Sequence, residues 1–235
     1  MQNVTSIKGH GQCTFRYLAD NKKKRENFPV KIWAEPPGRI CLQGDVAFNA
    51  RGIILGANQG EFWLLLRPKE ISGYWWGQWA QSNQTLGLVV SPEILLEVLG
   101  LAGLEEKGRW SLSNDGVFDI LTKKDDSDRI VKKIYIYCCD YRIRRVEYFN
   151  SDEKIAAVVE LAGYKKVSEG FTLPYFIDIF SDRKDEGFQE INIRLSAVKP
   201  ARFNEKQRQI LFTRPGTKGF ENVYRVIDGE VFEQP

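Results

Sequence analysis

The clearest strand–turn–strand pattern in the sequence is Gly52-Ile-Ile-Leu-Gly-Ala-Asn-Gln-Gly-Glu-Phe-Trp-Leu-Leu-Leu-Arg67. It contains two short apolar runs, 52–57 and 61–67, joined by Asn-Gln-Gly at 58–60. Asn and Gly tolerate positive φ, so this triplet predicts a tight hairpin turn. The run from Phe62 to Leu66 is apolar at every position, and a strand of that kind needs cover on both faces.

Alternation of period two recurs in short runs on either side of this hairpin, which indicates antiparallel strands. In the run 12–19, for example, Cys13, Phe15 and Tyr17 share one face. We expect a charged turn at 20–26 and a break in the sheet at Pro36-Pro37, because proline cannot continue a central strand. The whole chain predicts ten or eleven strands.

One helix is predicted over 91–100. Ser91 suits the N-cap position, Pro92 the first helical position and Gly100 the end of the helix. An apolar stripe at helical spacing is formed by Ile94, Leu95, Val98, Leu99 and Leu101. Core packing is the default meaning of that stripe, and it makes the helix a candidate cover for the sheet.

The composition is that of a folded, globular chain. The 235 residues are 43% apolar and 28% charged, and 34 Lys and Arg against 31 Asp and Glu give a net charge of +3. Basic groups at 22–25 and 142–145 have acidic neighbours, which disfavours nucleic-acid binding. No linker interrupts the strands, so we expect a single domain, 1–235, with its core at 12–225.

The residue types that carry most metal and nucleophile chemistry are scarce. His10 is the single histidine, which excludes a multi-histidine metal site. The acidic run 125–128 does not fit a calcium loop, whose twelfth position would be Ile136. We expect no metal and no cofactor.

The four cysteines are too few for a disulfide scaffold. Cys138 and Cys139 are adjacent, so on a strand they would face opposite sides, and we expect both to be small buried residues. A bridge between Cys13 and Cys41 stays open, depending on whether their strands are neighbours.

Aromatic residues are in excess, with 14 Phe, 9 Tyr and 6 Trp. Five of the six tryptophans fall between Trp33 and Trp79. Two interpretations stay open: a solidly packed core, or an apolar cavity between a curved sheet and a helical lid.

The sequence contains no run of 18 apolar residues that would span a membrane. Residues 1–11 also lack the pattern of an export signal. Either the protein is cytoplasmic, or an export or lipid-anchor signal is absent from this sequence.

Two short patterns resemble those of a known family. Lys31-Ile-Trp-Ala-Glu-Pro-Pro-Gly-Arg-Ile-Cys-Leu-Gln-Gly44, followed by Asn58-Gln-Gly-Glu-Phe-Trp63, is similar to the early strands of the LolA/LolB-like bacterial lipoprotein carrier superfamily. Phe212-Thr-Arg-Pro-Gly216 with Val223 resembles the family's C-terminal pattern. The resemblance covers residues 12–225.

The chain departs from the family at two points. In the LolA carriers an arginine before the proline helps to hold the closed lid, and here that position is Glu35, with Arg39 no equivalent. The family's N-terminal helix is missing or shortened to 3–8. We therefore expect the fold to be shared without the lipoprotein-release mechanism.

The resemblance implies a mainly β (α+β) fold: a strongly curved antiparallel sheet that forms an unclosed β-barrel with a helical lid, LolA/LolB-like, binding acyl chains in the cell envelope without cofactor. We expect a monomeric, non-enzymatic binder or carrier of a lipid or lipoprotein acyl chain or another apolar ligand. It would lie in the periplasm or at the outer membrane, exported or lipid-anchored, with the cytoplasm as the alternative. The alternative function is an envelope sensor that acts through a partner protein on the same fold, and an enzyme is a third class.

The alternation selects candidate cavity residues on one face of the sheet: Phe15, Ile40, Leu42, Phe62, Leu64, Trp76, Ile177 and Ile193. The helix adds Ile94, Leu95 and Val98. A slip of one residue in a strand would move its side chains to the other face.

Overall fold

The structure is a computed structural model. It describes residues 6–19, 22–46, 49–67, 72–79, 92–101, 109–183, 187–227 and 230–234. The strands, in chain order, are β1 (Ile7–Ala19), β2 (Lys22–Glu35), β3 (Arg39–Val46), β4 (Asn49–Ala57), β5 (Glu61–Leu66), β6 (Gly73–Gln78), β7 (Arg109–Asn114), β8 (Phe118–Lys124), β9 (Ile130–Tyr137), β10 (Arg142–Phe149), β11 (Ile155–Ala162), β12 (Lys165–Ser168), β13 (Phe171–Leu173), β14 (Phe176–Arg183), β15 (Gly187–Pro200), β16 (Val223–Ile227) and β17 (Glu230–Gln234). The helices are α1 (Pro92–Val98) and α2 (Glu205–Phe212).

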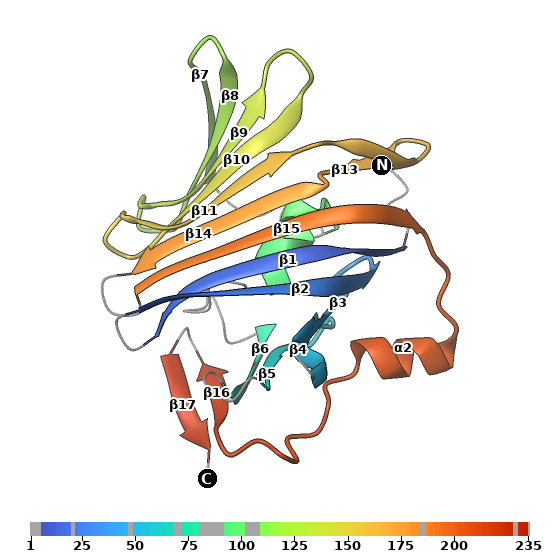
Figure 1. The fold of residues 1–235 in the computed structure, drawn as a ribbon. Helices are drawn as coiled ribbons and strands as arrows, with labels where there is room; N and C mark the ends of the chain where they lie inside the picture. Colours follow the sequence, from blue (N-terminus) through green and yellow to red (C-terminus); the bar gives the residue numbers. More distant parts are fainter. Residues whose placement is uncertain are drawn as a thin grey trace.

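Most of these strands form one large curved sheet (Figure 1). Its fifteen strands run in the order β17-β16-β6-β5-β4-β3-β2-β1-β15-β14-β11-β10-β9-β8-β7, and β12 and β13 pair separately. In the described part of the chain the two outermost strands, β17 and β7, do not pair with each other, so the sheet stays open. The mainly β, open-sheet fold is therefore confirmed, but the expected ten or eleven strands are too few.

The undercount has local causes. The expected strand 171–180 is two strands, β13 and β14, and short β12 lies before them. The C-terminal ribbon β16–β17 was not predicted, and β16 joins β6 in parallel, which makes one exception to the antiparallel pairing. The charged turn expected at 20–26 is also wrong, because residues 22–26 already belong to β2 and pair with β1.

The sheet buries apolar side chains on both faces, as the run from Phe62 to Leu66 requires. On the concave face, the inner core includes Val30, Leu42, Leu55, Phe62 and Ile177. On the convex face, a smaller outer core is formed by Cys41, Ile54, Trp63, Leu65, Tyr74, Phe203 and Phe212. Adjacent residues of β5 thus enter different cores, because successive side chains of a strand point to opposite faces.

Helix α1 packs on the concave side of the sheet, and its Ile94, Leu95 and Val98 are buried in the inner core. Across the concave side, its Glu97 accepts hydrogen bonds from Lys132 Nζ at 2.8 Å and from the Tyr148 hydroxyl at 3.0 Å. These contacts connect α1 with β9 and β10. The expected N-cap, Ser91, lies outside the described residues.

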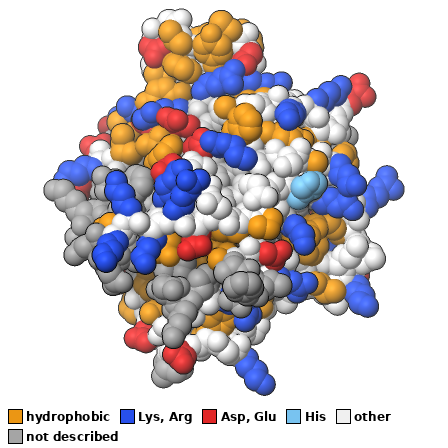
Figure 2. All heavy atoms as spheres, in the orientation of Figure 1, with side chains coloured by type: hydrophobic (Ala, Val, Ile, Leu, Met, Phe, Trp, Pro, Cys, Tyr) orange, Lys and Arg blue, Asp and Glu red, His pale blue; other side chains and the backbone are white. Residues whose placement is uncertain are grey.

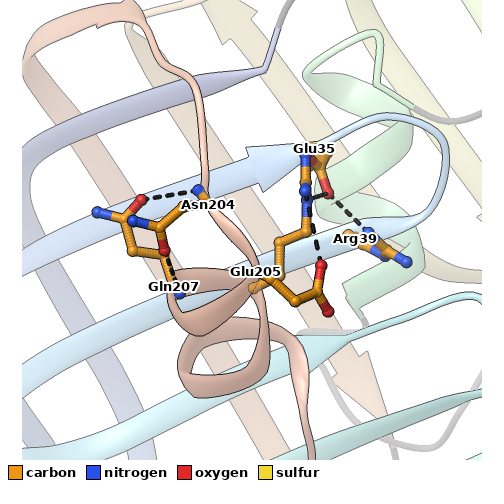
Figure 3. Close-up of polar contacts among 6 residues, drawn as sticks. Glu35, Arg39, Asn204, Glu205 and Gln207 are labelled. Carbon is orange, nitrogen blue, oxygen red and sulfur yellow. Dashed lines mark hydrogen bonds and ion pairs between the residues drawn. The ribbon is translucent and has the colours of Figure 1, made fainter.

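Helix α2 was not predicted, and it packs on the convex side (Figure 1). Its N-terminus is a capping box: the Asn204 side chain accepts from the Gln207 amide, and the Gln207 side chain accepts from the Asn204 amide (Figure 3). Phe212 is the one residue of α2 that is fully buried. The helix therefore lacks the apolar stripe by which sequence patterns reveal helices.

Glu35, at the end of β2, ties α2 to the sheet. Its carboxylate accepts hydrogen bonds from Arg208 of α2, at 2.9 Å and 3.0 Å, and from Arg39 at 2.7 Å (Figure 3). The hydrogen bonds from Arg208 lower the pKa of Glu35 below its ordinary value, and burial opposes that shift. Glu35 thus occupies the position of the family's arginine with the opposite charge, and its partners are two arginines.

We predict that Glu35→Gln destabilises the protein in a pH-dependent way. Because the pKa of Glu35 is lowered in the folded state, its contribution to stability is complete above the ordinary glutamate pKa of about 4.3 and is lost as pH falls through the lower folded value. In urea unfolding, wild type should exceed E35Q in free energy of unfolding by a constant difference between about pH 5 and 7. The difference should shrink below about pH 4.

Glu205→Gln is the matched control, because Glu205 faces the same Arg208 at 3.7 Å but is 75% exposed. It should leave stability nearly unchanged at every pH. A difference between wild type and E35Q that does not vary with pH would contradict the assigned role of the Glu35 carboxylate.

Candidate functional site: an apolar cavity on the concave face

A cavity of about 380 Å³ opens on the concave face of the sheet. It is bordered by Cys13, Phe15, Tyr17, Leu18, Phe28, Leu42, Ile53, Leu55, Leu64, Leu66, Ser72, Trp75, Gln189, Ile191, Ile193 and Tyr224. Apart from Ser72, which precedes β6, these residues come from eight strands that are consecutive neighbours in the sheet: β15, β1, β2, β3, β4, β5, β6 and β16. The curvature of these eight strands lets β15 and β16, the outer two of them, border the same cavity.

None of the described residues that border the cavity carries a charged side chain. The deep side chains are almost fully buried, with Leu55 2% and Phe28 3% exposed. Burial raises the pKa of the Cys13 thiol to about 12, so the thiol is neutral near pH 7. The remaining polar groups on the border are neutral hydroxyl and amide groups of residues such as Ser72 and Gln189. The site therefore presents apolar surface and no charge.

Aromatic rings stack on two sides of the cavity. The rings of Phe15 and Tyr17, both on β1, lie 4.8 Å apart at an interplanar angle of 23°. The rings of Trp75 on β6 and Tyr224 on β16 lie 5.3 Å apart at 19°. Stacked rings present broad, rigid apolar faces, so part of the aromatic excess borders a cavity and part fills the two cores.

The candidate residues predicted from the sequence, apart from Trp76, divide into two groups. Phe15, Leu42, Leu64 and Ile193 border the cavity. The inner core holds Ile40, Phe62, Ile94, Leu95, Val98 and Ile177, all buried, without bordering the cavity. Helix α1 is thus a buried part of the concave side, and the described part of it does not border the cavity.

Trp76 is a correction. Its side chain packs against the outer core, where the guanidinium carbon of Arg214 lies 4.1 Å from its ring centroid. The pairing of β5 with β6 explains this: Leu64 lies opposite Trp75, and Trp63 lies opposite Trp76. The two tryptophans are adjacent, so the sequence pattern did not indicate which of them shares the face of Leu64.

Several residues on the border were missed. Cys13 and Tyr17 share the face of Phe15, so the alternation along β1 already contained them. Ile53 and Leu55 follow in the same way from β4. Tyr224 had no signal in the sequence, because it reaches the cavity only through the parallel pairing of β16 with β6.

The cysteines differ from expectation in two ways. Cys138 and Cys139 lie in the turn between β9 and β10, and Cys139 is exposed, so their assignment as buried strand residues is wrong. Cys13 and Cys41 are free. Strand β2 separates their strands, and their side chains enter different cores, which excludes the bridge that the sequence left open.

Two further features of the described residues bear on the site. They contain no group of three or more His, Cys, Asp or Glu side chains placed to hold a metal ion. Neither of their helices has the length and apolar character needed to cross a lipid bilayer.

The protein has an open, curved sheet of mainly antiparallel strands, with a helix and an apolar cavity on its concave face. Solved structures with a similar fold include a LolA superfamily protein from Nitrosomonas europaea, with a TM-score of 0.55, 12% identity, and 88% of this chain and 90% of that chain covered. A putative outer membrane lipoprotein-sorting protein domain from Vibrio parahaemolyticus gives a TM-score of 0.55 at 13% identity, covering 86% and 88% of the two chains.

A DUF1329 family protein from Desulfovibrio piger has a TM-score of 0.56 at 10% identity, covering 88% of this chain and 90% of that chain. No family model and no curated protein sequence matches the chain. The expected likeness to the LolA superfamily is confirmed at the level of the fold: this chain has a LolA-like fold.

We predict that burial protects two of the four thiols. Alkylation requires the thiolate, and burial raises the pKa of Cys13 and of Cys41 to about 12. At about pH 8 a maleimide should label Cys139 fastest, Cys138 more slowly, and Cys13 and Cys41 only after addition of denaturant. Peptide mass spectrometry of the labelled protein reads each site separately. Rapid labelling of Cys13 in the native protein would mean that the cavity opens much more widely than the structure indicates.

Proposed function

We propose that the protein is a non-enzymatic binder or carrier of a lipid or lipoprotein acyl chain, or of another apolar ligand, in the concave cavity. The observation that carries this proposal is the uncharged, mostly apolar border of the cavity. Each buried methylene group contributes about 0.8 kcal/mol, so a chain of several methylenes offsets much of the cost of association. A border without carboxylate or imidazole groups favours binding over acid–base catalysis.

Helix α1 is the proposed lid. It lies on the concave side, and Glu97 connects it to β9 and β10 through Lys132 and Tyr148. Because the described part of α1 does not border the cavity, α1 would admit a ligand by breaking those contacts and leaving the inner core, which would enlarge the concave space. The lid role also accords with the helix that the resemblance places there.

The wider proposal concerns location and organisation. The likeness of fold to a putative outer membrane lipoprotein-sorting protein domain supports a place in the cell envelope, in the periplasm or at the outer membrane. One sheet that includes both β1 and β17 supports a single domain, 1–235. We propose that this domain acts as a monomer, with an envelope protein as a further partner.

Filling the cavity should weaken ligand binding. Leu64 is partly buried, borders the cavity and lies opposite Trp75, so the indole of Leu64→Trp would occupy the space. A lysophospholipid below its critical micelle concentration is the probe, measured by isothermal titration calorimetry and native mass spectrometry. L64W should bind at least about tenfold more weakly than wild type, equivalent to about 1.4 kcal/mol.

The matched control is Leu112→Trp, which makes the same substitution at a residue that is 67% exposed on β7. L112W should bind the lysophospholipid as wild type does, and thermal unfolding verifies that both variants fold. Absence of binding to wild type, or equal binding to L64W and L112W, would overturn the proposed function.

A second candidate function, the envelope sensor, is favoured by a different part of the molecule. Strands β7–β10 form an arm that extends from the rest of the sheet, and hydrophobic side chains gather at its far end (Figures 1 and 2). Val117 is 51% exposed and Tyr141 77% exposed in the two turns at that end. Exposed apolar residues of this kind are typical of contacts with a partner protein.

We predict that a partner that binds the arm is lost on double substitution Val117→Ser and Tyr141→Ser. Affinity capture from cell-envelope extracts, with quantitative mass spectrometry, compares this variant with wild type. The control is Val231→Ser with Phe232→Ser, two residues on β17 that are 49% and 47% exposed at the opposite edge of the sheet. Equal recovery of every captured protein by both variants would contradict the sensor function.

A further inference from the structure

A second cleft lies on the convex face, on the other side of the sheet from the apolar cavity. Its volume is about 510 Å³, and it is bordered by residues of β3, β4 and β5, by the end of α2 and by the segment that follows α2. Its chemistry differs from that of the cavity, because three arginines border it: Arg51, Arg67 and Arg214. None of the described residues on its border is a carboxylate.

The three guanidinium groups are not equally occupied. Arg214 donates to Glu61 at 2.8 Å, so part of its charge is neutralised. Within the described residues Arg51 and Arg67 have no ion pair, although the Asp45 carboxylate lies near Arg51 and accepts its backbone N–H at 2.8 Å. Among these residues the cleft therefore has two arginines without an ion pair and one whose charge is shared.

Two of the arginines are oriented by aromatic rings. The guanidinium carbon of Arg67 lies 5.0 Å from the ring centroid of Phe220, and that of Arg214 lies 4.1 Å from the centroid of Trp76. Stacking of this kind fixes the plane of a guanidinium and leaves its N–H groups at the edge free to donate. Arg51 adopts a φ of 59°, which departs from the regular strand conformation.

A buried donor without a partner lies at the same cleft. Trp63 is 1% exposed and borders the cleft, and its indole nitrogen has no hydrogen-bond partner among the described residues. The ring lies across Gly56, where a Cβ atom would be 2.3 Å from it, so only glycine leaves room for this position. The indole nitrogen would lie 2.4 Å from that Cβ atom, so the N–H group is buried against β4 beside the cleft and can report on what the cleft binds.

We propose that this cleft binds a phosphate group. A carboxylate has two oxygens, which one arginine can satisfy in a bidentate pair. A phosphate has more acceptor oxygens and up to two negative charges, which suits several arginines contributed by separate segments of the chain. The site is distinct from the acyl-chain cavity, since Trp63 and Leu64 are adjacent on β5 but face opposite sides of the sheet.

The first experiment titrates wild type with inorganic phosphate by isothermal titration calorimetry, at constant ionic strength, with acetate as the comparison anion. Wild type should bind phosphate at least about tenfold more tightly than acetate. Arg51→Gln and Arg67→Gln should each weaken phosphate binding about threefold to tenfold. The control is Lys154→Gln, which removes a cation that is 72% exposed in the turn between β10 and β11, far along the sheet from β3, β4 and β5, and should change the affinity less than about twofold.

A second readout separates specific binding from a general effect of charge. In a ¹⁵N-correlated NMR spectrum the indole N–H resonance of Trp63, assigned through Trp63→Phe, should shift on addition of phosphate. The shift should be absent in the R51Q/R67Q double variant. No phosphate binding, equal loss in K154Q, or an unmoved Trp63 resonance would each overturn the proposal.

The source of the phosphate is distinguished by vesicles. Phosphatidylcholine vesicles with and without phosphatidic acid are sedimented with wild type and with R51Q/R67Q. Recruitment by phosphatidic acid that the double variant loses assigns the site to a lipid headgroup. Binding of inorganic phosphate without recruitment assigns it to a soluble phosphate compound, and both results support the site.

Discussion

Successive side chains of a β-strand point to opposite faces, so an apolar run such as that from Phe62 to Leu66 can be buried only if both faces of the sheet are covered. The structure meets this constraint with two cores. On the concave face, Phe62 belongs to the inner core and Leu64 packs against it. On the convex face, Trp63 and Leu65 belong to the outer core beneath α2. Helix α2, its capping box and the Glu35–Arg208 ion pair all serve to hold that second cover in place.

The two faces then differ in the chemistry of the space that they leave. On the concave side, curvature of the eight strands from β15 to β16 leaves a cavity that uncharged, mostly apolar side chains border without closing. On the convex side the indole of Trp63 lies directly on the backbone at Gly56, beside a cleft that three arginines border. Two of these arginines, Arg67 and Arg214, lie over aromatic rings. One sheet thus separates an uncharged cavity from a cleft bordered by positive charges.

Features with a local cause could be predicted from the sequence. Period-two alternation identified most strands, the Asn-Gln-Gly turn produced the β4–β5 hairpin, and the stripe of Ile94, Leu95 and Val98 identified α1. Four cavity residues, among them Phe15 and Leu42, followed from the same alternation. The LolA-like fold was recognised from short patterns near residues 31–44 and 212–223.

Features that depend on non-local pairing could not be predicted. Trp75 and Trp76 are adjacent tryptophans, so only the pairing of β6 with β5, which places Trp75 opposite Leu64, determines which ring faces the cavity. Helix α2 buries one residue completely, so it shows almost no apolar periodicity, although its capping pair Asn204 and Gln207 was present as a signal. Whether the concave face is hollow depends on the summed volumes of side chains from eight strands, which no single segment determines.

The parallel pairing of β16 with β6 affects the order in which the molecule is completed during synthesis. Tyr74 on β6 pairs with Val223 on β16, 149 positions later by their numbers, and Tyr224 stacks on Trp75 at the cavity. A chain still on the ribosome has β1 to β6 long before it has Tyr224, so one side of the cavity is absent while the residues between them are translated. During that interval the face of Trp75 on which Tyr224 stacks lacks its partner, and the cavity is completed well after the strands that form most of its border.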